Sequence, residues 1–255
     1  MRTRADASST RHVAVVSGAH DNILHLALTP PVTPLPAATL MLVRDREELE
    51  VLMVERHGDM LFGPGALVFP GGKLDPQDGD PAWPGCSTGA AEPDPQGREL
   101  RICAIRETFE ETGLLLARRK DGEPTIGDTT ALRAKLIARE ASFRQVVASL
   151  GLQLDLGALT LFARWITPLR QPIRFDASFY IARAPEAQTA VCDGRETVMA
   201  EWLAPAVALA LADAGSRKLM RPTRANLALL SQSPSAAHAM EAARARLVET
   251  VLQAD

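Results

Sequence analysis

The 255-residue chain has few cysteines. Cys86, Cys103 and Cys192 are odd in number and widely scattered, with none of the paired spacing that a disulfide framework or a cysteine-bound metal requires. We therefore expect reduced thiols in a cytoplasmic protein. The five histidines also form no cluster in the sequence, so none is assigned a role.

The chain also lacks a long hydrophobic run and a strong net charge. No stretch approaches the roughly 20 apolar residues that span a bilayer, and residues 13–16 are too short for the core of a signal peptide. The net charge is −3, with basic and acidic residues interspersed, which is unlike the basic footprint of a nucleic-acid-binding protein. The sequence thus predicts neither a membrane span nor an extended nucleic-acid-binding surface.

Apolar residues make up 46% of the chain, which is enough for a sizeable core in one enlarged domain. Apolar runs of strand type predict strands over residues 38–43, 49–55, 66–69, 159–166, 177–182 and 198–203. Helical spacing predicts helices over residues 95–117, 129–150 (with a restart near Ser142), 204–212, 223–230 and 235–252.

One of these helices carries an unusual concentration of acid. Glu107, Glu110 and Glu111 follow the i, i+3, i+4 spacing that places side chains on one helix face, and like charges at this spacing repel by roughly 0.2–0.5 kcal/mol per pair. Three crowded carboxylates offer the hard oxygen ligands that Mg²⁺ or Mn²⁺ prefers. Taken alone, the segment is better explained as a solvated acidic face.

A glycine turn lies upstream of the acidic helix. The apolar run at 65–68 leads into Phe69, Pro70, Gly71 and Gly72, which predicts a strand ending in a tight turn. Adjacent glycines let the backbone approach a ligand closely. A turn of this kind is common, so its meaning depends on the acidic helix that follows it.

Together the turn and the helix resemble the signature of the Nudix hydrolases. Gly72 matches the first glycine of that signature, and its second half is matched in register by Arg106, Glu107, Glu110, Glu111, Gly113 and Leu114. Asp78 stands where the family has a glutamate, and Thr108 stands at an apolar position. The stretch between Asp78 and Arg106 is much longer than in the family and is rich in proline and glycine, which predicts an inserted surface loop.

The resemblance implies a fold and its boundaries. It predicts an α/β protein, a Nudix-type α/β/α sandwich with a mixed sheet, whose core covers about residues 37–205. To this core it adds a loop insertion at 79–94, a helical insertion at about 129–150 and a helical C-terminal extension at about 204–252.

Within the family, the chain is similar to the peroxisomal acyl-coenzyme A diphosphatases, a branch with an insertion in the same place. The similarity includes residues 101–107, 165–168 and 174–176. A stretch typical of the coenzyme A branches keeps Arg56, whereas His57 and Leu61 depart from it, Leu61 replacing a second arginine. The chain does not end in a peroxisomal address of the Ser-Lys-Leu kind.

The resemblance also implies a site. Glu107, Glu110 and Glu111 would bind Mg²⁺ or Mn²⁺, and Arg106 would orient them. Glu196 would be a further ligand or the catalytic base, an interpretation that we weigh evenly against a structural role, with Glu201 as its competitor.

Substrate contacts are predicted at Arg56, Gly71 and Gly72. Trp165 and Arg174 are further candidates, because an aromatic face can stack on adenine and a guanidinium can grip phosphate. The alternatives are that Trp165 fills the core and that Arg174 pairs with Asp176.

The function implied is metal-dependent hydrolysis of a diphosphate linkage in a nucleoside diphosphate derivative, with coenzyme A or an acyl-coenzyme A as the first choice of substrate. ADP-ribose or a dinucleotide is the second choice. A ligand-binding regulator without turnover, or an interaction module built on the C-terminal helices, remains open, as does a homodimer.

Overall fold

The computed structural model describes residues 32–60, 63–89, 95–119 and 127–253. Its centre is a nine-stranded mixed sheet in the order β11-β3-β2-β1-β9-β8-β12, with β10 pairing with β2 and β4 with β1. The strands are β1 Leu35–Asp45, β2 Leu49–Arg56, β3 Ala66–Val68, β4 Gly71–Lys73, β8 Thr160–Ile166, β9 Phe175–Arg183, β10 Thr197–Leu203, β11 Lys218–Leu219 and β12 Thr250–Leu252. β1 runs parallel to β9 and antiparallel to β2.

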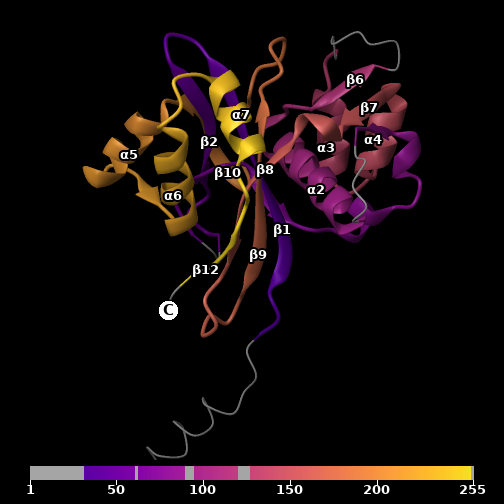
Figure 1. The fold of residues 1–255 in the computed structure, drawn as a ribbon. Coiled ribbons are helices and arrows are strands. Elements are labelled where there is room, and N and C mark those ends of the chain that lie inside the picture. The colour runs from indigo at the N-terminus through magenta and orange to yellow at the C-terminus, as the bar shows by residue number, and fades with distance from the viewer. Residues whose placement is uncertain (1–31, 61–62, 90–94, 120–126, 254–255) are drawn as a thin grey trace, which may run out of the picture.

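Helices cover both faces of this sheet (Figure 1). One face carries α2 Pro95–Thr112, α3 Thr130–Ile137 and α4 Phe143–Ser149, and the other carries α5 Pro205–Asp213, α6 Arg221–Leu230 and α7 Ala236–Ala245. A small second sheet, β5 Ser87–Thr88, β6 Ala117–Arg119 and β7 Leu152–Asp155, lies on the α2 side. This arrangement confirms the predicted α/β sandwich with a mixed sheet.

The central strand β1 explains why the sheet is covered on both faces. Successive side chains of a strand point to opposite faces, and here both sets are apolar. Leu40 and Leu42 pack into the core on the α2 side, whereas Met41 and Val43 pack into the core on the α7 side. A strand buried on both faces has a continuous apolar run, which is the pattern at 38–43.

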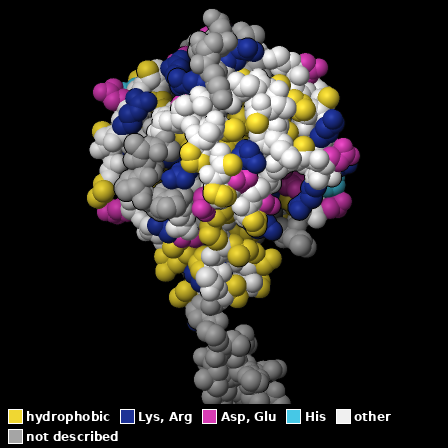
Figure 2. Space-filling model, turned by 90° about the vertical axis from the view of Figure 1, so that its right-hand side faces the viewer, with side chains coloured by type: hydrophobic (Ala, Val, Ile, Leu, Met, Phe, Trp, Pro, Cys, Tyr) yellow, Lys and Arg dark blue, Asp and Glu magenta, His cyan; other side chains and the backbone are white. Residues whose placement is uncertain are grey.

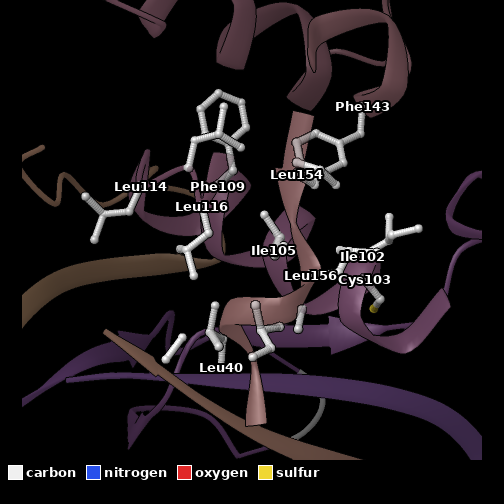
Figure 3. Packing of buried hydrophobic residues seen from close by; sticks show 14 of the residues in the cluster. Leu40, Ile102, Cys103, Ile105, Phe109, Leu114, Leu116, Phe143, Leu154 and Leu156 are labelled. Carbon is white, nitrogen blue, oxygen red and sulfur yellow. The ribbon is translucent and has the colours of Figure 1, made fainter. Parts of the chain in front are cut away.

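The core on the α2 side includes a residue from the supposed loop insertion. Trp83 is 1% exposed, and the centroid of its ring lies 5.7 Å from that of Phe143. The ring centroids of Phe143 and Phe109 are 6.0 Å apart. Figure 3 shows Phe109 and Phe143 in the same packed layer as Leu154. The 3-10 helices Pro76–Gly79 and Trp83–Gly85, followed by β5, give residues 79–88 a fixed path. The described part of the predicted insertion, 79–89, thus lies at the surface with most of its residues exposed or half-buried, but it contains short 3-10 helices and is fixed to the core by the buried Trp83.

Two helix boundaries also differ from the sequence prediction. The acidic helix ends at Thr112 rather than at residue 117, because Gly113 takes φ +75° and supplies the usual C-terminal stop. The last helix ends at Ala245, and residues 250–252 form β12 alongside β8 instead. The predicted break near Ser142 is confirmed, since Ser142 caps α4 and separates it from α3. The N-cap predicted at Asp94 lies outside the described residues.

Charged side chains of both signs are mixed over the face shown in Figure 2, whereas hydrophobic side chains gather at its lower end. Exposed apolar residues occur in the segments that reach that end of the sheet, namely Leu35, Leu169 and Ile173. None of the described helices has the length and apolar character needed to cross a bilayer.

Candidate active site

A cavity of about 400 Å³ lies beside the acidic helix. Four segments of the chain line it: the exposed face of α2, the turn after β4, the connection between α3 and α4, and the loop that precedes β10. Their lining residues are Asp75, Gln77, Arg106, Glu107, Glu110, Glu111, Leu136, Ile137, Arg139, Ala141, Ser142, Asp193, Arg195 and Glu196. Helical periodicity thus turns the carboxylates toward the cavity, whereas Ile105 and Phe109 are fully buried in the core.

The glycine turn lies directly against this acidic face. The Gly71 N–H donates to Glu111 Oε2 at 3.2 Å. A Cβ at position 72 would stand only 2.4 Å from the carboxyl carbon of Glu107, so no larger residue fits there without displacing that carboxylate. The two glycines are therefore needed for the close approach of backbone and carboxylates. They begin the short strand β4, which pairs with β1, and the chain bends just before them at Pro70, so the predicted tight turn does not extend over Gly71 and Gly72. We keep the name glycine turn for residues 69–72.

Arg106 is held by a buried ion pair with Asp78. Arg106 Nε lies 2.8 Å from Asp78 Oδ1 and Nη2 lies 2.9 Å from Oδ2, with Arg106 4% and Asp78 0% exposed. The other terminal nitrogen, Nη1, donates to Glu107 at 2.8 Å and to Glu110 at 3.3 Å. Arg106 thus orients two carboxylates and contacts them rather than open solvent, which fits its predicted orienting role.

Asp78 is the residue whose importance the sequence understated. It stands at the position of the first glutamate in the signature, and the longer insertion that follows it does not disturb its place beside Arg106. The Asp75 N–H also donates to Asp78 Oδ2 at 2.9 Å. The aspartate, although shorter than the glutamate of the signature, is therefore held both by Arg106 and by the backbone. The other departure, Thr108, is buried, and its hydroxyl donates to the Ala104 carbonyl within the helix.

The carboxylates of α2 oppose one another's ionisation. Burial raises the pKa of Glu107 to about 7, with Glu110 and Glu196 adding to the shift and Arg106 opposing it. Burial also raises the pKa of Glu111 well above its usual range, and the Glu107 charge adds to this, whereas Arg56 and the Gly71 N–H act in the opposite direction. The pKa of Glu110 is raised for the same reason, with burial as the main cause.

Glu196 belongs to this group, and Glu201 does not. Glu196 lines the cavity and acts electrostatically on all three carboxylates of α2. Glu201 lies along β10 and pairs with Arg217 at 3.5 Å. Of the two acidic candidates near Trp202, the structure therefore brings only Glu196 to the cavity.

The predicted substrate contacts separate into two groups. Arg56 lies close enough to Glu111 for its charge to oppose part of the burial-driven rise in the pKa of that carboxyl, so it is near the acidic face. Arg174 does not line the cavity: it is 5% exposed, and its guanidinium donates to the carbonyls of Thr167 at 3.1 Å and Val32 at 2.7 Å. Its predicted alternative partner, Asp176, pairs with Arg164 instead. We therefore leave Arg174 out of the proposed site.

Trp165 also lies away from the cavity lining. Its strand β8 is flanked by β9 and β12, and the side chain packs against the core on the α7 side. Its indole Nε1 is buried and has no hydrogen-bond partner among the residues that the structure describes. These contacts favour the alternative in which Trp165 fills the core.

The donor set suits a divalent cation, although it is not closed around one. Among the described residues, no group of three or more acidic, histidine or cysteine side chains is already arranged as a metal site. Glu107 and Glu110 are drawn to Arg106, and Glu111 accepts from Gly71. Each has its second oxygen free of hydrogen bonds within the described residues. Burial is the main cause of their raised pKa values and the neighbouring carboxylates add to it, and a bound cation would favour the charged form of each group.

Two cavity residues, Arg139 and Arg195, carried no signal in the sequence. Each lies in a segment without a motif, and only the folding of the helical insertion and of the loop before β10 brings them to the cavity.

A family model described as the NUDT19 Nudix domain matches residues 86–223, more than half of the chain. The chain belongs to the Nudix hydrolase family. The match starts after the glycine turn and Asp78, and it includes the acidic helix and Glu196. The sequence match and the geometry of the acidic face therefore lead to the same family.

Curated relatives point to the same branch. The acyl-coenzyme A diphosphatases NUDT19 of Gallus gallus and Homo sapiens are each 29% identical to this Nudix chain, over 64% and 71% of its length. Putative nudix hydrolase 7 of Caenorhabditis elegans is 30% identical over 71% of the chain. The matched regions cover only 56%, 57% and 56% of these relatives, so the chain spans little more than half of their length.

A solved structure gives the fold independent support. The crystal structure of the NUDIX hydrolase from Alicyclobacillus acidocaldarius is 32% identical and superposes with a TM-score of 0.72. The match covers 82% of this chain and 96% of that one.

Proposed function

We propose that this Nudix chain hydrolyses a diphosphate linkage in a nucleotide derivative. The observation that carries the proposal is the convergence of four carboxylates, Glu107, Glu110, Glu111 and Glu196, on one cavity beside a glycine turn. The family membership supports a hydrolase, and the acidic cavity supports chemistry on an anionic substrate that needs charge neutralisation.

Mg²⁺ or Mn²⁺ would be held by Glu107, Glu110 and Glu111, where it would neutralise the phosphates and acidify a water molecule. Glu196 is our candidate for the base that takes the proton from the attacking water, because it lines the cavity beside these ligands. The new bond forms between the water oxygen and phosphorus while the anhydride P–O bond breaks, which releases two monophosphates.

Arg106 serves this reaction indirectly. The Asp78–Arg106 pair fixes the guanidinium, and the guanidinium fixes Glu107 and Glu110. We therefore describe Arg106 as a positioning residue. Arg56, which lies near Glu111, remains our candidate for contact with a substrate phosphate.

Coenzyme A or an acyl-coenzyme A is the proposed substrate. The NUDT19 relatives are named acyl-coenzyme A diphosphatases, and Arg56 is the retained residue of the coenzyme A stretch. Cleavage of coenzyme A would give a phosphopantetheine and adenosine 3′,5′-bisphosphate. Leu61 replaces the second arginine of that stretch and lies outside the described residues. Because this arginine is missing, ADP-ribose or a dinucleotide is the second choice of substrate. A cytoplasmic location and a homodimer remain predictions from the sequence.

A substrate panel tests the proposal. Coenzyme A, dephospho-coenzyme A, an acyl-coenzyme A, ADP-ribose and a diadenosine polyphosphate are incubated with the protein and Mg²⁺, Mn²⁺ or excess chelator, and the monophosphate products are identified by mass spectrometry. We expect coenzyme A or its acyl form to be cleaved fastest, and only with metal. Faster cleavage of ADP-ribose would replace the substrate. Tight binding of a nucleotide without any cleavage would favour the non-catalytic regulator.

A further inference from the structure

Two arginines at the cavity differ from the others near it. Arg139 lies in the turn between α3 and α4, and Arg195 lies in the loop before β10. Both line the cavity and are exposed, and within the described part of the chain neither side chain makes a hydrogen bond or an ion pair. Arg106 and Arg133, in contrast, have their guanidinium groups bound to the protein. We refer to Arg139 and Arg195 together as the basic rim.

The backbone beneath Arg139 is held firmly. Arg133 donates to the Glu110 carbonyl from Nε at 3.0 Å and from Nη2 at 2.8 Å, which ties α3 to the end of the acidic helix. The Phe143 N–H donates to Gln77 Oε1 at 2.9 Å, which ties the start of α4 to the turn after β4. The helical insertion is thus a fixed wall of the cavity.

Arg139 also has a costly backbone conformation. It is the only non-glycine among the described residues with a positive φ, at +59°. Glycine is the residue that normally occupies this left-handed position after a helix. An arginine at a position suited to glycine is a strained choice, and strain of this kind is found preferentially at functional sites.

The backbone beneath Arg195 is equally well fixed. Asp193 accepts hydrogen bonds from the Glu196 N–H at 3.1 Å, the Thr197 N–H at 2.9 Å and the Thr197 hydroxyl at 2.7 Å. Gly194, at φ +71°, closes the turn with its N–H on the Thr197 carbonyl. Arg195 and Glu196 therefore both line the cavity from one loop whose backbone is held by hydrogen bonds.

Charge determines what the basic rim can bind. The rest of the cavity is dominated by carboxylates, which repel an anionic substrate, and Arg106 is already bound to Asp78. We propose that Arg139 and Arg195 bind phosphate groups of the substrate and hold them against the acidic helix. A guanidinium matches phosphate oxygens in bidentate fashion. The inference rests on the proposed function, because it assumes a phosphate-bearing substrate in this cavity.

The experiment separates binding from turnover. Binding of α,β-methylene-ADP, a diphosphate that water cannot cleave at this linkage, is measured by calorimetry in the presence of Mg²⁺, and KM and kcat are measured with the best substrate of the panel. The variants are Arg139→Ala, Arg195→Ala and the double variant, together with Arg139→Lys. Lys135→Ala is the matched control, since Lys135 is an exposed cation on the same helical insertion that does not line the cavity.

We expect each alanine variant to bind the analogue and the substrate about tenfold more weakly, and the double variant about a hundredfold more weakly, because charge-assisted contacts are of this strength. The kcat value should change less than KM. Arg139→Lys should recover part of the loss because it restores the charge, and Lys135→Ala should stay within about twofold of wild type in both measurements.

Arg139→Gly excludes misfolding as the explanation. Glycine suits the left-handed backbone at this position, so the melting temperature should stay the same or rise while binding weakens as much as in Arg139→Ala. Wild-type binding and KM in the double variant would overturn the inference even if the protein hydrolyses diphosphates. If the wild type cleaves none of the substrates but the double variant still loses binding of the analogue, the proposed function is rejected and the inference about the basic rim stands.

Discussion

The acidic helix and the basic rim form one cavity, but they are built in opposite ways. On the helix, Glu111 is buried and Glu107 is half-buried, and the two carboxylates are held by the Gly71 N–H and by Arg106, respectively. On the rim, Arg139 and Arg195 are exposed and have no partner within the described residues, although their backbones are fixed. The difference fits the two proposals, in which the acidic side binds a cation and the basic rim binds an anion.

The largest expected effect comes from breaking the acidic side. Glu111→Gln keeps the size of the side chain and removes its charge, so the fold should survive. Activity should fall by roughly 10²–10⁴-fold, the range expected for the loss of metal-assisted electrostatic stabilisation or of base catalysis. Steady-state kinetics with saturating Mg²⁺ measures the loss. A variant within about threefold of wild type would remove Glu111 from the proposed site.

The buried Asp78–Arg106 pair should be the next most sensitive feature. Asp78→Ala leaves the buried guanidinium of Arg106 without its bidentate partner, and breaking a pair of this kind costs roughly 3–5 kcal/mol in the free energy of unfolding. Urea denaturation of the metal-free protein measures the change. Glu201→Ala is the control, because its contact with Arg217 is long and partly exposed and should contribute at most about 1 kcal/mol. Equal losses in the two variants would contradict the structural role of Asp78.

Glu196 and Glu201 offer a matched comparison along one segment. Glu196→Gln should lower kcat by about 10²-fold, whereas Glu201→Gln should stay within about twofold, because only Glu196 lines the cavity. Similar kcat values for both variants would mean that the base lies elsewhere, and the comparison requires that both variants melt at the wild-type temperature.

The smallest predicted effect is a pH dependence of stability in the metal-free protein. The pKa of Glu107 is raised from 4.5 to about 7, so the folded state binds more protons than the unfolded state between these values. The free energy of unfolding contributed by this group is therefore fully present below about pH 4.5 and is lost as the pH rises through about 7, a change of at most about 3 kcal/mol.

Denaturation at pH 5 and pH 8 in chelator checks this sign. Glu107→Gln should reduce the loss of stability at the higher pH, and added Mg²⁺ should offset it in the wild type. If the free energy of unfolding falls equally between pH 5 and pH 8 in the wild type and in Glu107→Gln, the Glu107 carboxyl is not the source of the pH dependence.

The same contrast explains what the sequence could predict. The proposed metal ligands of the acidic side lie within five residues of one helix, so helical spacing alone predicts that Glu107, Glu110 and Glu111 share a face. The glycine turn and the main strands are also local patterns, and most of their positions agree with the structure. Asp78 was matched to the signature, but its burial against Arg106 depends on tertiary packing.

The basic rim could not be predicted in this way. Arg139 and Arg195 are far apart in the sequence and far from the acidic helix, and they meet the cavity only because Arg133 ties the helical insertion to Glu110 and Asp193 shapes the loop before β10. Trp83 was misjudged for a similar reason, since the surrounding prolines and glycines indicate a loop whereas its ring fills the core beside Phe143. Local composition carries no information on such long-range contacts.

The most direct test of the account is a calorimetric titration of the metal-free protein with Mn²⁺ at neutral pH, for the wild type and for the triple variant Glu107→Gln, Glu110→Gln, Glu111→Gln. We expect saturable binding to the folded wild type and no binding to the folded triple variant, because these carboxylates are the proposed ligands. Equal Mn²⁺ binding by the two proteins would contradict the claim that the acidic helix is the metal-binding side of the cavity.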